Sequence, residues 1–351
     1  RELVRKHPRS PYYIEAQFRL AEIAFSRQRY TKAEDAYTEV VVSKKNDRFY
    51  EKARFKRGWA RFKQEYYIEA VEDFLETVTY HDFDDFERLN QSEQDLFGEY
   101  FRAIGLSFSY LGGVEKLNQY FADKPDFKYL YYTYAHISEI YEKQHRFSDA
   151  VDAQRYYIKM HPNHQNVPLA YLRIFDIWKK GGFASKVYES LDEFYNKYNP
   201  QSQYWAKNKT DFKVYQKASQ KLKDNIVIVA KDNHAKYQQY RKKKFFLAAQ
   251  KWYERYLKHY TSQAKKDNIH YAYAELLSRG RAYKSALKQY ELAAYDSDII
   301  LNKEAAYATI RMTSKLFNRK KIAKQKKQAN LDKHLKYSLL YSQLYPNDKR
   351  S

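Results

Sequence analysis

Apolar residues recur along this chain with the spacing of helices that bury one face. Ala16, Leu20, Ala21, Ala24 and Phe25 occupy positions i, i+4, i+5, i+8 and i+9, which places them on one stripe of a helix. Runs of β-branched residues are scarce, and Lys, Arg, Glu, Gln, Ala and Leu dominate between the aromatic residues. Because these residues are favourable in helices, the pattern predicts an all-α chain.

A second pattern returns roughly every 34–38 residues. It consists of an aromatic residue, two variable residues, a small residue and then another aromatic residue. The pattern runs from Tyr30 to Tyr37, Tyr67 to Phe74, Phe147 to Tyr157, Phe245 to Trp252 and Tyr283 to Tyr290, with Ala33, Ala70, Ala150, Ala248 and Ala286 as the small residues. A fixed period of this length indicates stacked helix hairpins, in which the small residue lets two helices approach closely. Such arrays usually form binding surfaces.

Proline and glycine separate the predicted helices. The seven Pro residues fall between helix pairs, because Pro is disfavoured inside helices. Gly112, Gly113, Gly181, Gly182 and Gly280 fall within pairs, where we expect the left-handed conformation that ends a helix. The predicted pairs are 11–26 with 30–44, 48–64 with 67–80, 93–111 with 114–123, 127–143 with 147–160, 167–180 with 184–198, 221–242 with 245–260, 267–279 with 283–295, and 301–317 with 329–344. Residues 201–228 predict a degenerate repeat.

Charge divides the chain into two parts. Residues 1–200 hold 31 basic and 31 acidic residues, whereas residues 201–351 hold 34 basic and 12 acidic residues and so carry the whole net charge of +22. We therefore predict an N-terminal array over 1–200, with an acidic insertion at 81–92, and a basic C-terminal array over 201–351. This asymmetry bears on partners and not on the fold.

Few residues suggest catalysis or metal binding. His161 and His164 share a loop without an acidic neighbour, the acidic insertion lacks the spacing of a calcium loop, and no nucleophile–base arrangement stands out. Cysteine is absent, which excludes disulfides and thiolate metal sites. We expect no cofactor, no metal and no enzymatic activity. The chain shows neither an apolar run of membrane-spanning length nor an initiating Met, so we also expect it to be a fragment of a longer protein.

These positions resemble the tetratricopeptide repeat (TPR). Leu20-Ala21 and Gly58 match its Leu-Gly positions, the five alanines given above match its Ala position, and Pro162 matches its late Pro. The resemblance implies a right-handed α-solenoid of helix hairpins. The segments Pro8–Leu20, Tyr50–Phe74 and His234–Leu257 further resemble TPR proteins of the bacterial cell envelope, which implies a periplasmic or outer-membrane-associated adaptor, with a cytoplasmic location as the alternative.

The 38 tyrosines exceed what the repeat core requires, which suggests that some contact a partner. Counting the register back from the alanine position predicts aromatic residues on the concave side: Phe18, Phe25, Phe55, Trp59, Tyr132, Tyr237, Tyr240 and Tyr271. Arg241 and Arg279 are candidate charge contacts. We therefore expect a scaffold that binds a protein or peptide partner.

The basic half of the chain supports an alternative. A basic patch is predicted at Arg241, Lys242, Lys243, Lys244, Arg319, Lys320 and Lys321. Basic residues interleaved with aromatic residues suit a nucleic-acid backbone or an anionic lipid surface. A solvated basic face that keeps a tyrosine-rich protein soluble explains the same residues without any ligand.

Overall fold

The computed structural model describes residues 2–43, 48–81, 83, 86–124, 127–208, 212–264, 268–296, 299–319 and 323–350. In these ranges the chain is built mainly from α-helices, and most of them pack against a neighbour in the sequence. The expected all-α fold of TPR-like helix hairpins is confirmed. A short antiparallel pair, β1 (Tyr295–Asp296) and β2 (Ile299–Ile300), is added after one hairpin. Within the described ranges, no helix is long and apolar enough to cross a membrane.

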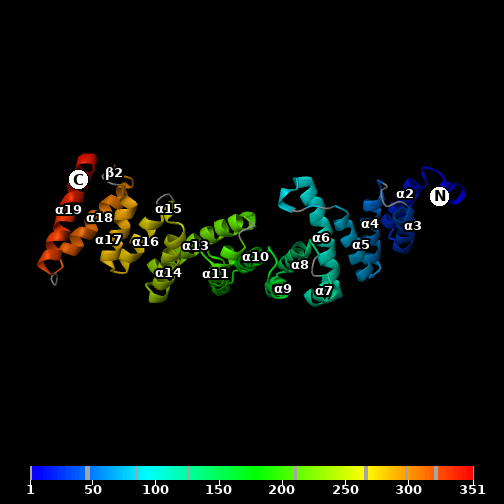
Figure 1. Cartoon of the computed structure of the whole chain (residues 1–351), viewed down its shortest axis with the longest axis horizontal. Helices are drawn as coiled ribbons and strands as arrows, with labels where there is room; N and C mark the ends of the chain where they lie inside the picture. The colour runs from blue at the N-terminus through cyan, green and yellow to red at the C-terminus, as the bar shows by residue number, and fades with distance from the viewer. Residues whose placement is uncertain are drawn as a thin grey trace. The chain divides into compact units, whose positions relative to one another are not determined.

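The chain divides into two compact units, residues 1–190 (unit 1) and 191–351 (unit 2). Figure 1 shows successive helices lying side by side within each unit. Unit 1 contains α1 (Glu2–Lys6), α2 (Tyr13–Ser26), α3 (Tyr30–Ser43), α4 (Tyr50–Lys63), α5 (Tyr67–Tyr80), α6 (Gln91–Leu111), α7 (Val114–Phe121), α8 (Leu130–Lys143), α9 (Phe147–Met160) and α10 (Val167–Lys180), and α11 (Ala184–Tyr198) crosses the boundary. Unit 2 continues with α12 (Gln203–Lys207), α13 (Phe212–Tyr240), α14 (Lys243–His259), α15 (Thr261–Ala264), α16 (Ile269–Arg279), α17 (Tyr283–Ala294), α18 (Lys303–Phe317) and α19 (Lys324–Leu344).

One predicted element is wrong. Residues 201–228 do not form a separate degenerate repeat, because α13 runs without a break from Phe212 to Tyr240 and takes in most of that segment. The sequence of α13 contains no Gly or Pro, and its buried stripe runs from Val214 to His234. Only the short α12 precedes it, anchored by Trp205, whose indole N–H donates to the carbonyl oxygen of Tyr198 at 2.9 Å.

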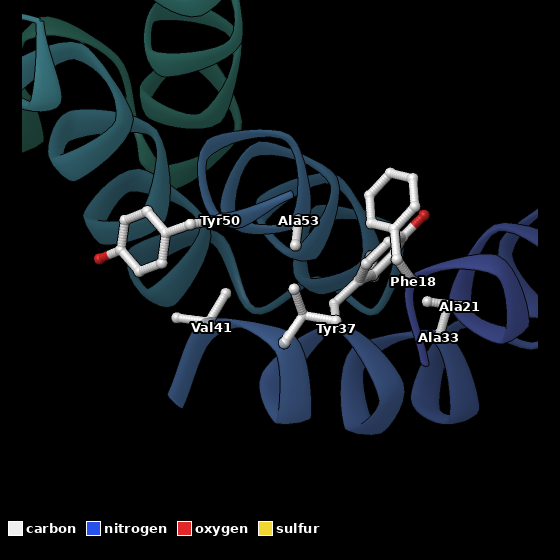
Figure 2. Packing of buried hydrophobic residues seen from close by; sticks show 9 residues of the cluster. Phe18, Ala21, Ala33, Tyr37, Val41, Tyr50 and Ala53 are labelled. Atoms are coloured by element: carbon white, nitrogen blue, oxygen red, sulfur yellow. The ribbon is translucent and has the colours of Figure 1, made fainter. Parts of the chain in front are cut away.

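The first hairpin shows how the repeat packs. Ala21 on α2 and Ala33 on α3 are fully buried, and Figure 2 shows them side by side where the two helices approach. The rings of Phe18 and Tyr37 meet edge to face at 6.0 Å between centroids. Ala53 of α4 closes the same cluster. The small residues permit the close approach, and the aromatic rings fill the space beside it.

Buried tyrosines also receive a polar partner from the first helix of their own pair. The hydroxyl of Tyr37 donates to Glu22, and the hydroxyl of Tyr290 donates to Glu275. The partner lies 15 residues earlier in the chain in both cases. Burial raises the pKa of both phenols, with the glutamate hydrogen bond as a second cause. Part of the tyrosine excess is therefore structural, because the hydroxyl needs such a partner when buried.

We expected five glycines in the turns within pairs to adopt the left-handed conformation, and only some of them do. Gly112, Gly113 and Gly182 have positive φ angles, as predicted, but Gly280 has φ −77° and Gly181 has φ −75°. The left-handed position of the other turns is occupied by Gln28, Glu65, His145, Arg241 and Arg281. Gly181 and Gly280 instead make room for aromatic rings, because an added Cβ would overlap Phe183 and Phe246 respectively.

Candidate functional site

In unit 1, α6 and α8 are each the first helix of a pair. They lie next to each other and form the floor of a groove. Gly105 allows this approach, since a Cβ at that position would lie 3.1 Å from the backbone nitrogen of Ile137. The helix α7 between them in sequence is only 8 residues long. The polar faces of α6 and α8 therefore lie together on the side away from α7 and α9.

The groove contains a hollow of about 480 Å³. Its walls come from α6, α8 and the short 3₁₀ turn Phe86–Arg88, and consist of Phe86, Gln91, Gln94, Asp95, Gly98, Glu99, Arg102, His136, Glu139, Ile140 and Lys143. At Gly98 an added Cβ would meet no atom within 4 Å, so this position opens into free space. The hollow has the size of a site for a few side chains, with an apolar end at Phe86 and charged groups of both signs.

Arg102 links the hollow to the predicted aromatic residues. Its guanidinium donates to Glu99 at 2.5 and 2.9 Å, and its central carbon lies 5.6 Å from the ring centroid of Trp59. This hydrogen bond is the main reason that the pKa of Glu99 is lowered. Glu99 is therefore a carboxylate at neutral pH, and it binds Arg102 of the same helix, whose guanidinium also lies near Trp59 of α4.

His136 presents an acceptor at the floor of the hollow. Its ring stacks on Phe101 at 5.4 Å between centroids, and its Nδ1 lies 2.8 Å from the carbonyl oxygen of Tyr132. Desolvation lowers the pKa of His136, so the imidazole is neutral at pH 7. The tautomer follows from this contact: Nδ1–H donates to the carbonyl, which leaves Nε2 as an acceptor.

At the far end of the groove, α8 is tied to α10. Arg173 of α10 donates to the buried carboxylate of Glu142 at 2.5 Å and approaches Glu139 at 3.5 Å. Lys180 also binds Glu142, at 3.1 Å. These bonds hold α10 against α8 beside Glu139, which is one wall of the hollow.

The predicted aromatic residues of unit 1 have different environments. Phe18 is 7% exposed and packs on Tyr37 and Phe49, so we assign it to the core. Phe25 is half-buried against Tyr30. Phe55, Trp59 and Tyr132 are half-buried, and Phe55 and Trp59 touch each other. Tyr132 contacts Phe86 and Phe101 beside the hollow.

The predicted residues of unit 2 do not form one cluster. Tyr237, Tyr240 and Arg241 lie at the end of α13, where Arg241 stands 5.9 Å above the ring of Tyr237 and Tyr240 is 53% exposed. In the next hairpin, Tyr271 of α16 packs on Tyr290 of α17. Arg279 is exposed, 4.0 Å from Glu275.

The basic patch is partly described. Lys242, Lys243 and Lys244 are exposed at the start of α14. Arg319 is exposed at the end of α18, and Lys320 and Lys321 lie outside the described residues. The two basic stretches of the sequence thus belong to turns of two different hairpins.

Sequence reasoning missed the charged part of the groove: Glu99, Arg102, His136, Glu139 and Lys143. The helix register counted from the alanine positions predicts only aromatic residues on the concave side. The available signal was the spacing of charges, since Asp95, Glu99 and Arg102 on α6 lie four and three residues apart and share one helix face.

In the described part of the chain, no three His, Cys, Asp or Glu residues come together as a metal site would require. His164 is instead bound to the hydroxyl of Tyr157, with Nδ1 2.6 Å from the oxygen. Within the acidic insertion, Asp82, Asp84 and Asp85 lie outside the described residues.

No family model matches this chain, and no curated protein matches it. Solved TPR structures are similar to it. The C-terminal part of a TPR protein from Cytophaga hutchinsonii has 13% identity, with 82% of this chain and 97% of that chain covered and a TM-score of 0.34. A TPR protein from Parabacteroides merdae has 12% identity, coverage of 85% and 98%, and a TM-score of 0.27. The TPR2AB domain of yeast Sti1 in complex with pHSP90 has 11% identity, coverage of 95% and 98%, and a TM-score of 0.26. Because these TM-scores are below 0.5, the fold assignment depends on the helix pairs of this chain itself.

Proposed function

We propose that this chain is a non-catalytic scaffold that binds a protein partner through the groove on α6 and α8. The observation that carries the proposal is the hollow at Gly98, which lies open between side chains that are held in place by Glu99–Arg102 and Arg173–Glu142. An extended peptide suits this site because the groove offers an apolar end, charged groups of both signs and the Nε2 acceptor of His136. Preformed walls lower the cost of ordering the site on binding.

A steric variant tests the groove. Gly98→Phe fills the hollow, and it does so without a clash at Cβ because nothing lies within 4 Å of that position. Peptides selected from a displayed random library on the wild-type chain should bind Gly98→Phe at least about tenfold more weakly in fluorescence anisotropy, a change that corresponds to about 1.4 kcal/mol. Ser148→Phe, at an exposed position of α9, adds the same ring elsewhere and serves as the control. Equal affinity for wild type and Gly98→Phe would show that the groove is not the binding site.

The location in the cell is a separate part of the proposal. The resemblance of Tyr50–Phe74 and the related segments to envelope TPR proteins supports a role in a bacterial cell-envelope complex. Fractionation of the source cells, followed by immunodetection of this chain, should recover it with the periplasm or the outer membrane. Recovery in the cytoplasmic fraction would contradict the envelope role and leave the groove proposal standing.

A further inference from the structure

The turns that join the two helices of each pair in unit 2 lie along one edge of that unit. These turns follow α13, α16 and α18. Each helix of the series α13, α14, α16, α17, α18 and α19 contacts the next one in the series. Because short turns make such neighbours antiparallel, every second helix ends at the same edge. Side chains connect the three turns: Phe246 lies against Gly280, and Lys315 and Arg319 lie 4.9 and 5.8 Å from the ring centroid of Tyr283.

This edge is lined by cations. The first turn carries residues 241–244, the second carries Arg281 and Lys284, and the third carries Lys315 and Arg319, and all of these side chains are exposed. We call these residues the basic edge. Among the residues that the structure describes, no carboxylate forms an ion pair with any of them. Their charge therefore faces solvent without a counter-charge, although Lys315 and Arg319 also lie over the ring of Tyr283 on α17.

The left-handed position of the turn differs between the two units. The left-handed position of the turn holds Arg241 and Arg281 in unit 2, whereas it holds Gln28, Glu65 and His145 in unit 1. Glycine adopts this backbone conformation at a lower cost than arginine does, so the backbone does not select arginine there. A row of like charges also repels itself, which makes the row costly unless something anionic neutralises it.

We propose that the basic edge binds the headgroups of an anionic lipid surface. Exposed apolar groups flank the first turn, since Tyr240 is 53% and Leu247 is 51% exposed. Tyrosine beside lysine and arginine suits the boundary between headgroups and acyl chains. A single-stranded nucleic acid would instead need exposed ring faces for base stacking, and the ring of Tyr283 is already covered by Lys315 and Arg319.

The test uses the full chain and sedimentation with lipid vesicles. Vesicles of phosphatidylcholine with phosphatidylglycerol should bind the wild-type chain, and vesicles of phosphatidylcholine alone should not. The triple variant Lys243→Glu, Lys284→Glu and Lys315→Glu removes one cation from each turn. We expect the partition coefficient to fall by roughly a hundredfold or more, because each basic residue near an anionic surface adds severalfold to binding. Lys243 and Lys284 lie in the first turn of their helices, where glutamate is favourable, so the variant should remain folded.

The control variant carries the same change in net charge. Lys32→Glu, Lys63→Glu and Lys159→Glu alter exposed positions of unit 1, and this variant should lose only a few-fold in partition. An equal loss in both variants would overturn the proposal, because it would assign binding to net charge alone. The proposal would also be overturned if the wild-type chain ignored anionic vesicles while it bound an oligonucleotide duplex, or if it bound neither. None of these outcomes affects the groove in unit 1, which the Gly98→Phe variant tests separately.

Discussion

At the scale of single residues, buried charged groups join hairpins beside the apolar contacts. Asp73 on α5 is 1% exposed and accepts hydrogen bonds from Arg57 at 2.6 and 2.9 Å. It also accepts one from Arg61 at 3.1 Å, and Arg61 in turn binds Glu34 of the preceding hairpin at 2.8 Å. Arg61 therefore connects helices from two pairs, because it binds Asp73 on α5 and Glu34 on α3. The cluster contributes to register, because a shifted hairpin would leave these charges unpaired.

Removing this carboxylate should be costly. Asp73→Ala leaves Arg57, which is only 8% exposed, without its main counter-charge. We expect the free energy of unfolding to fall by about 3–5 kcal/mol, measured by urea titration with circular dichroism. Asp149→Ala is the matched control, because Asp149 pairs with Arg146 at the surface and its loss should cost less than about 1 kcal/mol. Similar losses for both variants would mean that the buried cluster has no special role.

At the scale of helices, glycine has two opposite roles. Gly58 on α4 faces α5, and an added Cβ would lie 2.5 Å from the ring of Phe74. Gly98 on α6 faces open space. A Gly→Ala substitution should therefore have opposite effects on stability at these two positions. Steric overlap opposes alanine at Gly58, whereas only the helix propensity, which favours alanine, changes at Gly98.

Gly58→Ala should destabilise the chain by about 1–3 kcal/mol, because the forced shift of Phe74 outweighs the better helix propensity of alanine. Gly98→Ala should stabilise it by up to about 1 kcal/mol. Thermal unfolding of the two variants beside wild type measures both signs. If Gly58→Ala raised the midpoint, the close contact between α4 and α5 would be refuted.

The helices were predictable from the sequence because their signals are local. The stripe of Ala16 to Phe25 and the Pro positions predict α2 and its neighbours to within a few residues. The groove was less predictable. Whether Phe18 faces the core or a partner depends on a rotation of one residue about the helix axis, and the open space at Gly98 depends on the distance between α6 and α8. Both are tertiary quantities that the repeat pattern alone does not specify.

At the scale of the whole molecule, the two units share one fold but differ in their surfaces. In both units carboxylates hold cations between helices, as Glu142 holds Arg173 in unit 1 and Asp192 holds Arg255 in unit 2. Unit 2 adds the cations of the basic edge, which are exposed to solvent. The net charge of +22 therefore predicts surface behaviour better than it predicts fold.

Stability should depend on pH on the acid side of neutrality. Burial is the largest cause that lowers the pKa of five histidines, His136, His161, His164, His234 and His259. A histidine with a lowered pKa in the folded state takes up its proton more readily when unfolded. Its contribution to the free energy of unfolding is therefore present above the ordinary pKa of 6.5 and is lost as the pH falls through the folded pKa.

The free energy of unfolding should therefore decrease below about pH 6.5, by about 1.4 kcal/mol per pH unit for each proton bound only on unfolding. His234→Gln, at a buried position on α13, should flatten this slope in urea titrations at successive pH values. A free energy that stays constant between neutrality and pH 5 would contradict the buried, neutral state of these imidazoles.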